Sequence, residues 1–308
     1  MRVDFKERLL ECLGGPWPEP CPLEPRVEET TEHDGYRLEK VTYQVEPGER
    51  VPAYVVIPAG VDRAKPAPAV CVWHQHNGAY GIGKTEPAGL GGAEMHHTGV
   101  HLAREGYVAL CPDAAGFGER QVGKLKGAAL ERFLFLKYVT NGQCLAWKNI
   151  LDMRRAVDYL ITRPEVQADQ LGCYGHSMGS THSYLIGPWE PRLKVVIGNC
   201  CFPTLAAINR AEILHCFPNF IPGLLKYGDV PEMASLIAPR ALHLNLGETD
   251  YGTPMPEAKA GIETIARAYE AVHAEENFTS FIEPDVGHEL SPAMWERVKQ
   301  TFAKHLKS

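Results

Sequence analysis

The residues in this chain that are best suited to chemistry lie in a glycine-flanked pentapeptide, Gly175-His176-Ser177-Met178-Gly179. An apolar run at residues 170–174 leads directly into it, and residues 180–186 can continue as a helix. This context predicts a sharp strand-to-helix turn on which the Ser177 hydroxyl is lifted clear of the surrounding structure. An accidental loop serine is the alternative, but the flanking pattern favours a nucleophile.

A serine nucleophile needs a histidine to accept its proton and a carboxylate to orient that histidine. After a turn of this kind the acid comes next along the chain, and the histidine follows the acid. The segment after an apolar run at residues 241–246 offers Asp250, which is the predicted acid, and Glu248 as the alternative acid. His288 is the predicted base, because it lies in the segment after an apolar run at residues 279–282.

A tetrahedral intermediate formed on Ser177 would also need N–H groups that stabilise its oxyanion. The backbone N–H of Met178, at the start of the helix after the serine, is predicted to be one of them. The second should come from the loop after an apolar run at residues 69–73, where the N–H of Gln75 or of His76 could supply it.

Histidines elsewhere raise the possibility of a metal site. His74 and His76 alternate, and His97 and His101 are four residues apart, so they could converge with Glu94 on zinc. The chain has no His-Glu-x-x-His motif and no nearby cysteine ligand, and histidines at loop ends commonly cap backbone groups. We therefore expect no metal and no other cofactor.

A second competing motif is Gly78-Ala-Tyr-Gly-Ile-Gly-Lys-Thr85, which matches the phosphate-loop pattern letter for letter. A nucleotide site would require a helix to open at Lys84, but the proline and glycines in residues 86–92 disfavour one. The magnesium ligand would be Asp113, which follows Pro112 at the end of a short strand. The motif therefore lacks its structural context.

Apolar patterns predict the elements that would position these residues. Alternation at residues 41–45 and 51–57, on either side of Pro47-Gly48, indicates an antiparallel hairpin. Continuous apolar runs indicate strands buried on both faces, and helical periodicity indicates helices between them. The runs are 69–73, 107–111, 170–174, 193–197, 241–246 and 279–282, and the clearest helices are 143–162, 256–274 and 292–306. We expect an α/β fold with a mostly parallel, doubly wound sheet and helices on both faces.

The domain organisation follows from the same patterns. Residues 1–38 are expected to form an N-terminal helix and a Pro-rich connector, and residues 39–308 a single catalytic domain. The segments 116–142 and 198–239 are rich in glycine, proline and aromatic residues and fit the strand-helix rhythm poorly. They are candidates for a cap or a pocket wall.

Composition narrows the function classes. The net charge of −7 and the absence of a Lys/Arg run argue against a nucleic-acid partner, and no apolar stretch is long enough to span a membrane. The charged N-terminal residues do not resemble a secretory signal, and nine scattered cysteines suit reduced thiols, so we expect a cytoplasmic protein. Nothing in the sequence indicates an oligomeric state.

Taken together, the motifs resemble the α/β-hydrolase superfamily, in its dienelactone-hydrolase-like and acetyl-xylan-esterase-like branch. The motifs that carry the resemblance are His74-Gln-His-Asn-Gly78, Gly106-Tyr-Val-Ala-Leu-Cys-Pro-Asp113, Gly116-Phe-Gly-Glu-Arg120, Asp152-Met-Arg-Arg-Ala-Val-Asp-Tyr-Leu160, Arg163-Pro164, Gly175 to Gly179, Gly247-x-x-Asp250 and Gly287-His288. The resemblance implies hydrolysis of small-molecule carboxylic esters through an acyl-enzyme. A serine stands where dienelactone hydrolases carry cysteine, which argues against lactone opening.

Two other functions stay open from the sequence. One is a peptidase of the prolyl-oligopeptidase type, which shares the turn and the order of residues but normally carries a β-propeller. The other is a catalytically silent α/β-hydrolase that binds a small ligand. The absence of a secretory signal argues against polymeric xylan as the direct substrate.

Overall fold

The predicted hairpin is present in the structure. In the computed structural model, which describes residues 2–307, β2 (Tyr36–Glu46) and β3 (Glu49–Pro58) pair in antiparallel fashion. Gly48 in the turn has a φ of 81°, a left-handed conformation that glycine adopts without a steric penalty. The hairpin joins the rest of the sheet through antiparallel pairing of β3 with β5.

The six apolar runs form the parallel part of a nine-stranded sheet with the order β1-β2-β3-β5-β4-β6-β7-β8-β9. Their bounds are β4 (Ala67–Trp73), β5 (Val108–Pro112), β6 (Val166–His176), β7 (Leu193–Asn199), β8 (Ala241–Gly247) and β9 (Phe278–Glu283). Strands β4, β7 and β8 are buried along nearly their whole length, and β6 is buried from Leu171 onward, as expected of strands covered on both faces. The predicted mostly parallel sheet with an antiparallel start is confirmed.

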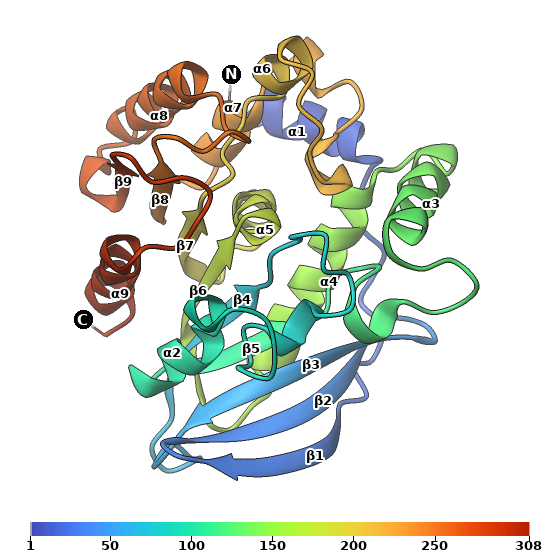
Figure 1. Cartoon of the computed structure of the whole chain (residues 1–308), viewed down its shortest axis with the longest axis vertical. Helices are drawn as coiled ribbons and strands as arrows, with labels where there is room; N and C mark the ends of the chain where they lie inside the picture. Colours follow the sequence, from blue (N-terminus) through green and yellow to red (C-terminus); the bar gives the residue numbers. More distant parts are fainter. Residues whose placement is uncertain (1, 308) are drawn as a thin grey trace.

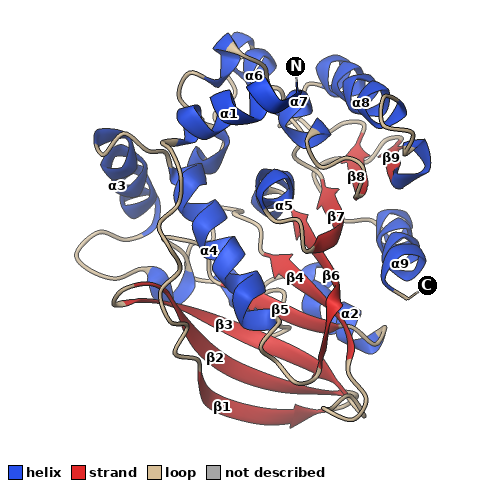
Figure 2. Cartoon of the chain, turned by 180° about the vertical axis from the view of Figure 1, so that it is seen from behind, coloured by secondary structure: helices blue, strands red, loops and turns tan. Residues whose placement is uncertain are grey.

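Helices cover both faces of this sheet. In Figure 1, α2 (Thr98–Arg104) and α9 (Pro292–Leu306) lie to the left of the central strands, and their apolar residues share one core cluster. Figure 2 shows α4 (Leu145–Leu160) and α5 (Met178–Ile186) on the opposite face, where a larger cluster also includes α8 (Met255–Glu270). Among residues 2–307, no helix combines the length and the apolar character needed to traverse a bilayer.

The N-terminal region differs from the prediction. Helix α1 (Arg2–Leu13) is where a helix was expected, but residues that were expected to be connector form strand β1 (Arg26–His33). This strand pairs with β2, so the expected boundary at residue 38 falls inside β2 and β1 belongs to the same sheet. The sequence hides β1 because the strand lies at the sheet edge with nearly every side chain exposed, which leaves no apolar alternation to detect.

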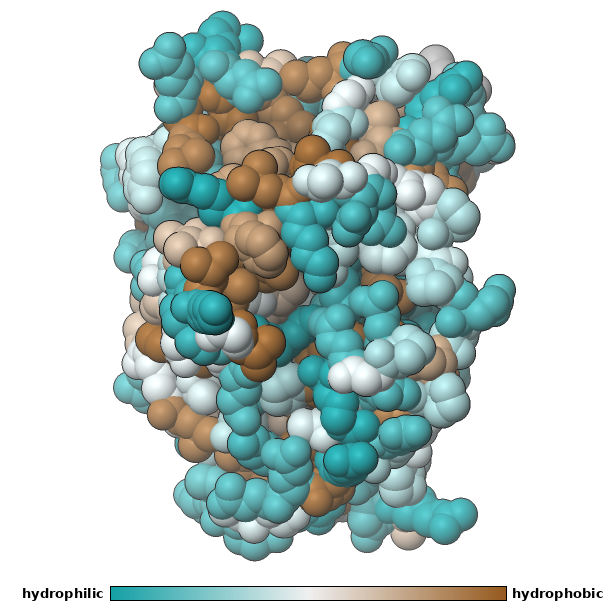
Figure 3. Space-filling model, turned by 90° about the vertical axis from the view of Figure 1, so that its right-hand side faces the viewer, coloured by the Kyte–Doolittle hydropathy of each residue, from teal (hydrophilic) through white to brown (hydrophobic). Residues whose placement is uncertain are grey.

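The two segments that fitted the strand-helix rhythm poorly contain helices of their own. Residues 116–142 include α3 (Gly127–Thr140), and residues 198–239 include α6 (Leu205–Arg210) and α7 (Val230–Ser235). Helix α3 is apolar on most sides, and three of its large side chains, Phe133, Leu136 and Val139, are exposed. Figure 3, which faces the side of the molecule that carries α3, shows hydrophobic residues gathered in the upper part of that side.

An ionic network with two buried cations, Lys148 and Arg120, ties the hairpin to α4. The ammonium group of Lys148 lies 2.9 Å from a Glu49 oxygen and 3.0 Å from an Asp152 oxygen. The guanidinium of Arg120 bridges the same two carboxylates at 2.5 and 2.7 Å. Such groups tolerate burial only because each charge has partners of opposite sign.

Candidate active site

The backbone around Ser177 forms the expected sharp turn. Strand β6 ends one residue before Ser177, and α5 begins one residue after it. Ser177 has a φ of 58° and a ψ of −120°, a conformation that non-glycine residues rarely adopt. A Cβ on Gly175 would lie 2.1 Å from the backbone of Gly179, and a Cβ on Gly179 would lie 2.1 Å from the carbonyl oxygen of Trp73. A side chain at either position would collide with the neighbouring backbone, so both positions require glycine.

The structure brings Ser177, His288 and Asp250 into one hydrogen-bonded chain. His288 Nε2 lies 2.8 Å from Ser177 Oγ, and His288 Nδ1 lies 2.8 Å from Asp250 Oδ2. Because a carboxylate can only accept, Nδ1 carries a proton and Nε2 is left to accept the serine proton. These are the distances expected of a nucleophile, its base and the acid that orients the base.

Asp250 is held as a carboxylate. Its side chain is almost completely buried, and its Oδ1 accepts a 2.9 Å hydrogen bond from the N–H of Gly252. Burial by itself would raise the pKa of Asp250, but the hydrogen bond and charge of His288, together with the Gly252 N–H, hold the pKa below its usual value. The acid therefore stays charged at neutral pH.

Glu248, the alternative acid, lies away from this chain of groups. Its side chain is 44% exposed and pairs with Lys259 at 3.5 Å. The segments that carry Asp250 and His288 meet instead through their backbones: the N–H of Thr249 donates to the carbonyl of Val286, and a Cβ on Gly247 would lie 2.0 Å from the carbonyl oxygen of Gly287.

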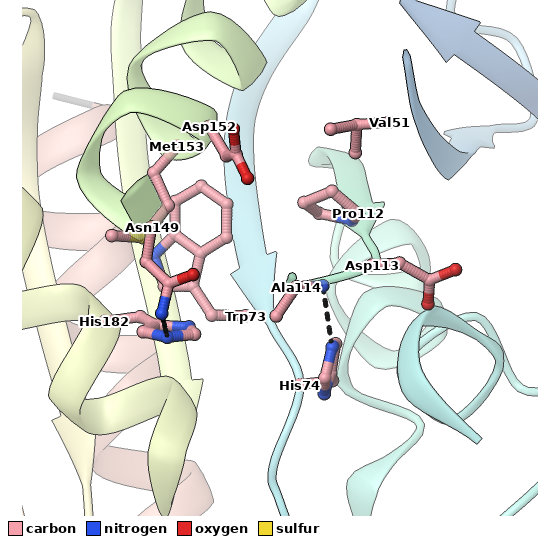
Figure 4. Close-up of a pocket in the computed structure, with 10 residues that line it drawn as sticks. All are labelled: Val51, Trp73, His74, Pro112, Asp113, Ala114, Asn149, Asp152, Met153 and His182. Atoms are coloured by element: carbon pink, nitrogen blue, oxygen red, sulfur yellow. Dashed lines mark hydrogen bonds between the residues drawn. The ribbon is translucent and has the colours of Figure 1, made fainter. Parts of the chain in front are cut away.

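The loop after β4 lies beside Ser177 and is held by its own side chains. His74 Nε2 accepts a hydrogen bond from the N–H of Ala114, drawn as a dashed line in Figure 4, so its Nδ1 carries the proton and donates to the carbonyl of Gln75. Gln75 Nε2 donates to both carboxylate oxygens of Glu86 at 3.0 Å. The loop backbone at Gln75 and His76 is therefore fixed from both sides.

We call the cavity above the serine the Ser177 pocket. It has a volume of about 470 Å³, enough for a small molecule. The loop after β4 and the two poorly fitting segments line it together with Ser177, His288 and the two residues that follow Asp250. The lining residues are Gln75, His76, Asn77, Gly78, Tyr80, Ala128, Glu131, Arg132, Ser177, Cys201, Ile213, Leu214, His215, Cys216, Phe217, Tyr251, Gly252 and His288. Both segments that were expected to form a cap or wall thus contribute to this pocket.

A second, much smaller cavity of about 20 Å³ lies near this loop (Figure 4). Its walls include His74, Asn149, Asp152 and His182, and Asn149 and His182 are hydrogen-bonded to each other. A space of this size holds about one water molecule and cannot hold a substrate.

The structure argues against the phosphate-loop interpretation. Residues Gly83–Thr85 form one turn of 3-10 helix, and the ammonium group of Lys84 is buried 2.8 Å from Asp113 Oδ2. The N–H of Lys84 donates to the other oxygen of Asp113, and a Cβ on Gly83 or on Gly118 would collide with that carboxylate. Gly83 and Lys84 of the motif, together with Gly118, therefore enclose an internal carboxylate.

The histidines that suggested zinc do not converge. His76 Nε2 bonds to Glu131, and His97 Nε2 bonds to the carbonyl of Gly91. Within the part of the chain that the structure describes, the one group of three or more His, Cys, Asp or Glu side chains with converging ligand atoms is Cys200, Asp250 and His288. Asp250 and His288 are already engaged there with each other.

Sequence reasoning missed several residues around the serine. His176, the second residue of the pentapeptide, packs its ring 5.2 Å from that of His288, and Asn199 holds it by a 2.9 Å hydrogen bond. Cys201 reaches the Ser177 pocket from the segment after β7, where it adopts a φ of 57°. Glu131 lies inside the apolar helix α3. The only sequence signal for the walls of the Ser177 pocket was the aromatic-rich composition of residues 116–142 and 198–239.

A parallel sheet with a serine on the turn after a central strand, followed in the chain by an acid and a histidine, defines an α/β-hydrolase. A model of the Abhydrolase family matches residues 11–291, so the chain belongs to this family. It is 32% identical over 280 residues to "Putative hydrolase YtaP" of Bacillus subtilis (strain 168), which covers 89% of this chain and 88% of that protein.

Solved structures show the same fold. A "putative acetyl xylan esterase" of Bacteroides fragilis NCTC 9343 matches with a TM-score of 0.73 and 18% identity, over 92% of this chain and 74% of the other. A glucuronoyl esterase from Solibacter usitatus matches with a TM-score of 0.69 and 16% identity, over 98% and 91% of the two chains. The resemblance to an acetyl-xylan-esterase-like branch is thus confirmed for the fold.

Proposed function

We propose that this protein is a serine esterase that hydrolyses carboxylic esters of small molecules through an acyl-enzyme intermediate. The observation that carries the proposal is the hydrogen-bonded chain from Ser177 through His288 to the buried Asp250, at the base of the Ser177 pocket. Family membership and the esterase names of structurally similar proteins support it.

In the first half of the reaction, His288 Nε2 takes the proton of Ser177 as Oγ attacks the ester carbonyl. Asp250 stabilises the imidazolium that forms and keeps its Nδ1–H oriented. The oxyanion is stabilised by the N–H of Met178, which as the first residue of α5 has no intrahelical acceptor, and by an N–H of Gln75 or His76. His288 then gives its proton to the leaving alcohol.

In the second half, His288 activates a water molecule, which attacks the acyl-enzyme carbonyl. The same N–H groups stabilise the second tetrahedral intermediate, and its collapse returns the proton to Ser177 and releases the acid. Every step uses protein groups beside Ser177 and water, so the proposed reaction calls for no cofactor.

The pocket walls support a substrate of small-molecule size. The alternative of a prolyl-oligopeptidase-type enzyme expects a β-propeller, whereas residues 2–307 form a single nine-stranded sheet. None of the nine cysteines is disulfide-bonded, which supports the proposal that the protein works in the reducing cytoplasm.

The test is the loss of ester hydrolysis in Ser177→Ala, with Ser280→Ala on strand β9 as a matched control. We expect Ser177→Ala to lower kcat for p-nitrophenyl acetate by about 10³-fold or more, and Ser280→Ala to leave it unchanged. A fluorophosphonate probe should label the wild type and Ser280→Ala but not Ser177→Ala. Full turnover by Ser177→Ala would refute the proposal. A wild-type protein that neither hydrolyses esters nor reacts with the probe would be a catalytically silent α/β-hydrolase, and this result would refute the proposal as well.

A further inference from the structure

Helix α3 carries a buried carboxylate in the wall of the Ser177 pocket. Glu131 is the only acidic residue of this helix, whose sequence is otherwise largely apolar, and its side chain is almost completely buried. Burying a carboxylate costs several kcal/mol unless hydrogen-bond donors satisfy it. The partners of Glu131 therefore indicate why it is there.

Both side-chain partners of Glu131 come from the loop that follows β4. His76 Nε2 lies 3.0 Å from Glu131 Oε2, and the Tyr80 hydroxyl donates to the same oxygen at 2.7 Å. The N–H of Gly78 donates to His76 Nδ1, so the proton of the neutral ring is on Nε2 and points to Glu131. Both nitrogens of His76 are thereby committed.

Ring contacts and hydrogen bonds also connect the loop after β4 to the segment that precedes α3. The Phe117 ring lies about 5 Å from the rings of His74, His76 and Tyr80. The carbonyl of Tyr80 accepts hydrogen bonds from the N–H of Gly118 and from Gln121 Nε2. Hydrogen bonds and ring contacts therefore connect the loop after β4, the segment before α3 and α3 itself.

We propose that Glu131 is a positioning residue: through His76 and Tyr80 it holds the loop after β4 so that its backbone N–H faces the oxyanion formed at Ser177. This inference rests on the proposed esterase function. We call the group of Glu131, His76 and Tyr80 the α3 latch.

The latch should act on the transition state more than on substrate binding. The second N–H of the oxyanion site, at Gln75 or His76, would form its full hydrogen bond only when the carbonyl oxygen becomes negative. An interaction made only in the transition state changes kcat, while KM stays the same. Damage to the pocket wall alone would instead change KM, because the wall contacts the bound substrate in both states.

The experiment compares two variants of the latch with a control on the same helix. Glu131→Gln removes the charge that both donors share, and Tyr80→Phe removes one donor but keeps the ring on Phe117. Lys137→Gln removes a charge from an exposed position of α3 that does not line the pocket. For each, kcat and KM are measured with p-nitrophenyl acetate, as is the inhibition constant of phenylboronic acid, which forms a tetrahedral serine adduct that mimics the intermediate.

We expect Glu131→Gln to lower kcat about tenfold and to weaken boronate inhibition by a similar factor, with KM changed less than about twofold. Tyr80→Phe should shift both quantities in the same direction by about threefold, and Lys137→Gln should change neither. Unchanged kcat and boronate inhibition in a folded Glu131→Gln would overturn the inference, and so would a change confined to KM. If Glu131→Gln does not fold, Tyr80→Phe decides.

The result is separable from a failure of the proposed function. If Ser177→Ala abolishes hydrolysis while the latch variants behave like the wild type, the esterase stands and the latch does not. If Ser177→Ala remains fully active, both fail together.

Discussion

The assignment of Asp250 as the acid can be tested by changing one atom. In Asp250→Asn, an amide replaces the carboxylate that accepts the Nδ1–H of His288 at 2.8 Å. If the new NH₂ group faces His288, Nδ1 must become the acceptor and the proton moves to Nε2, which is 2.8 Å from Ser177 Oγ. An Nε2 that already carries a proton cannot take one from the serine, so we expect kcat to fall by about 10⁴-fold.

The matched control is Glu248→Gln, which makes the same change two residues earlier. Glu248 is 44% exposed and its ion pair with Lys259 spans 3.5 Å, so its removal should change kcat by less than about twofold. Both variants are assayed with p-nitrophenyl acetate at neutral pH, and circular dichroism checks that they are folded. A large loss in Glu248→Gln together with near-normal activity in Asp250→Asn would show that our choice of acid is wrong.

Three further predictions concern stability. Gly179→Ala would place a methyl group 2.1 Å from the Trp73 carbonyl, so urea denaturation should show a loss of about 2 kcal/mol or more, along with reduced kcat. Lys84→Met leaves the buried Asp113 carboxylate without its cation and should lower the free energy of unfolding by about 3 kcal/mol in the same assay. Burial alone would raise the pKa of Glu49, but its cationic neighbours Arg120 and Lys148 lower the pKa from 4.5 to about 2. The Glu49 carboxylate therefore stabilises the fold above pH 4.5, and this stabilisation is lost as the pH falls toward 2. Glu49→Gln should therefore be less stable than the wild type by about 1 kcal/mol at neutral pH, after allowance for solvent screening, and thermal melts should converge near pH 2. A constant difference across that range would contradict this origin.

The central sheet could be predicted from the sequence because its strands are buried on both faces. A run such as residues 69–73 has to be apolar throughout, and β4 is found there. The edge strand β1 obeys no such requirement, since its side chains face solvent and only backbone pairing with β2 defines it. Backbone pairing leaves little trace in the order of residue types.

The residues of the candidate site also differ in how well the sequence predicts them. Ser177 lies between Gly175 and Gly179, which close backbone contacts require, so local sequence points to it. His288 could be predicted because it lies in the segment after β9. The choice between Asp250 and Glu248 depends on which side chain turns inward, and two residues of spacing do not reveal that. Glu131 could not be predicted at all, because its partners lie 51 and 55 residues away and meet it only in the folded protein.

The backbone contact at Gly247 has a consequence for protein engineering. Because the segments that carry Asp250 and His288 touch main chain to main chain there, no side chain of α3 is needed to place them relative to each other. Residues 198–239 do contribute, since His215 bonds to the carbonyl of Gly252 and Cys200 to that of Glu289. Libraries that diversify α3 at positions other than Glu131 can therefore search for new substrates without disturbing the alignment of Asp250 with His288. The same contact makes Gly247 a position that such libraries should leave untouched, since even a methyl group would force the two segments apart.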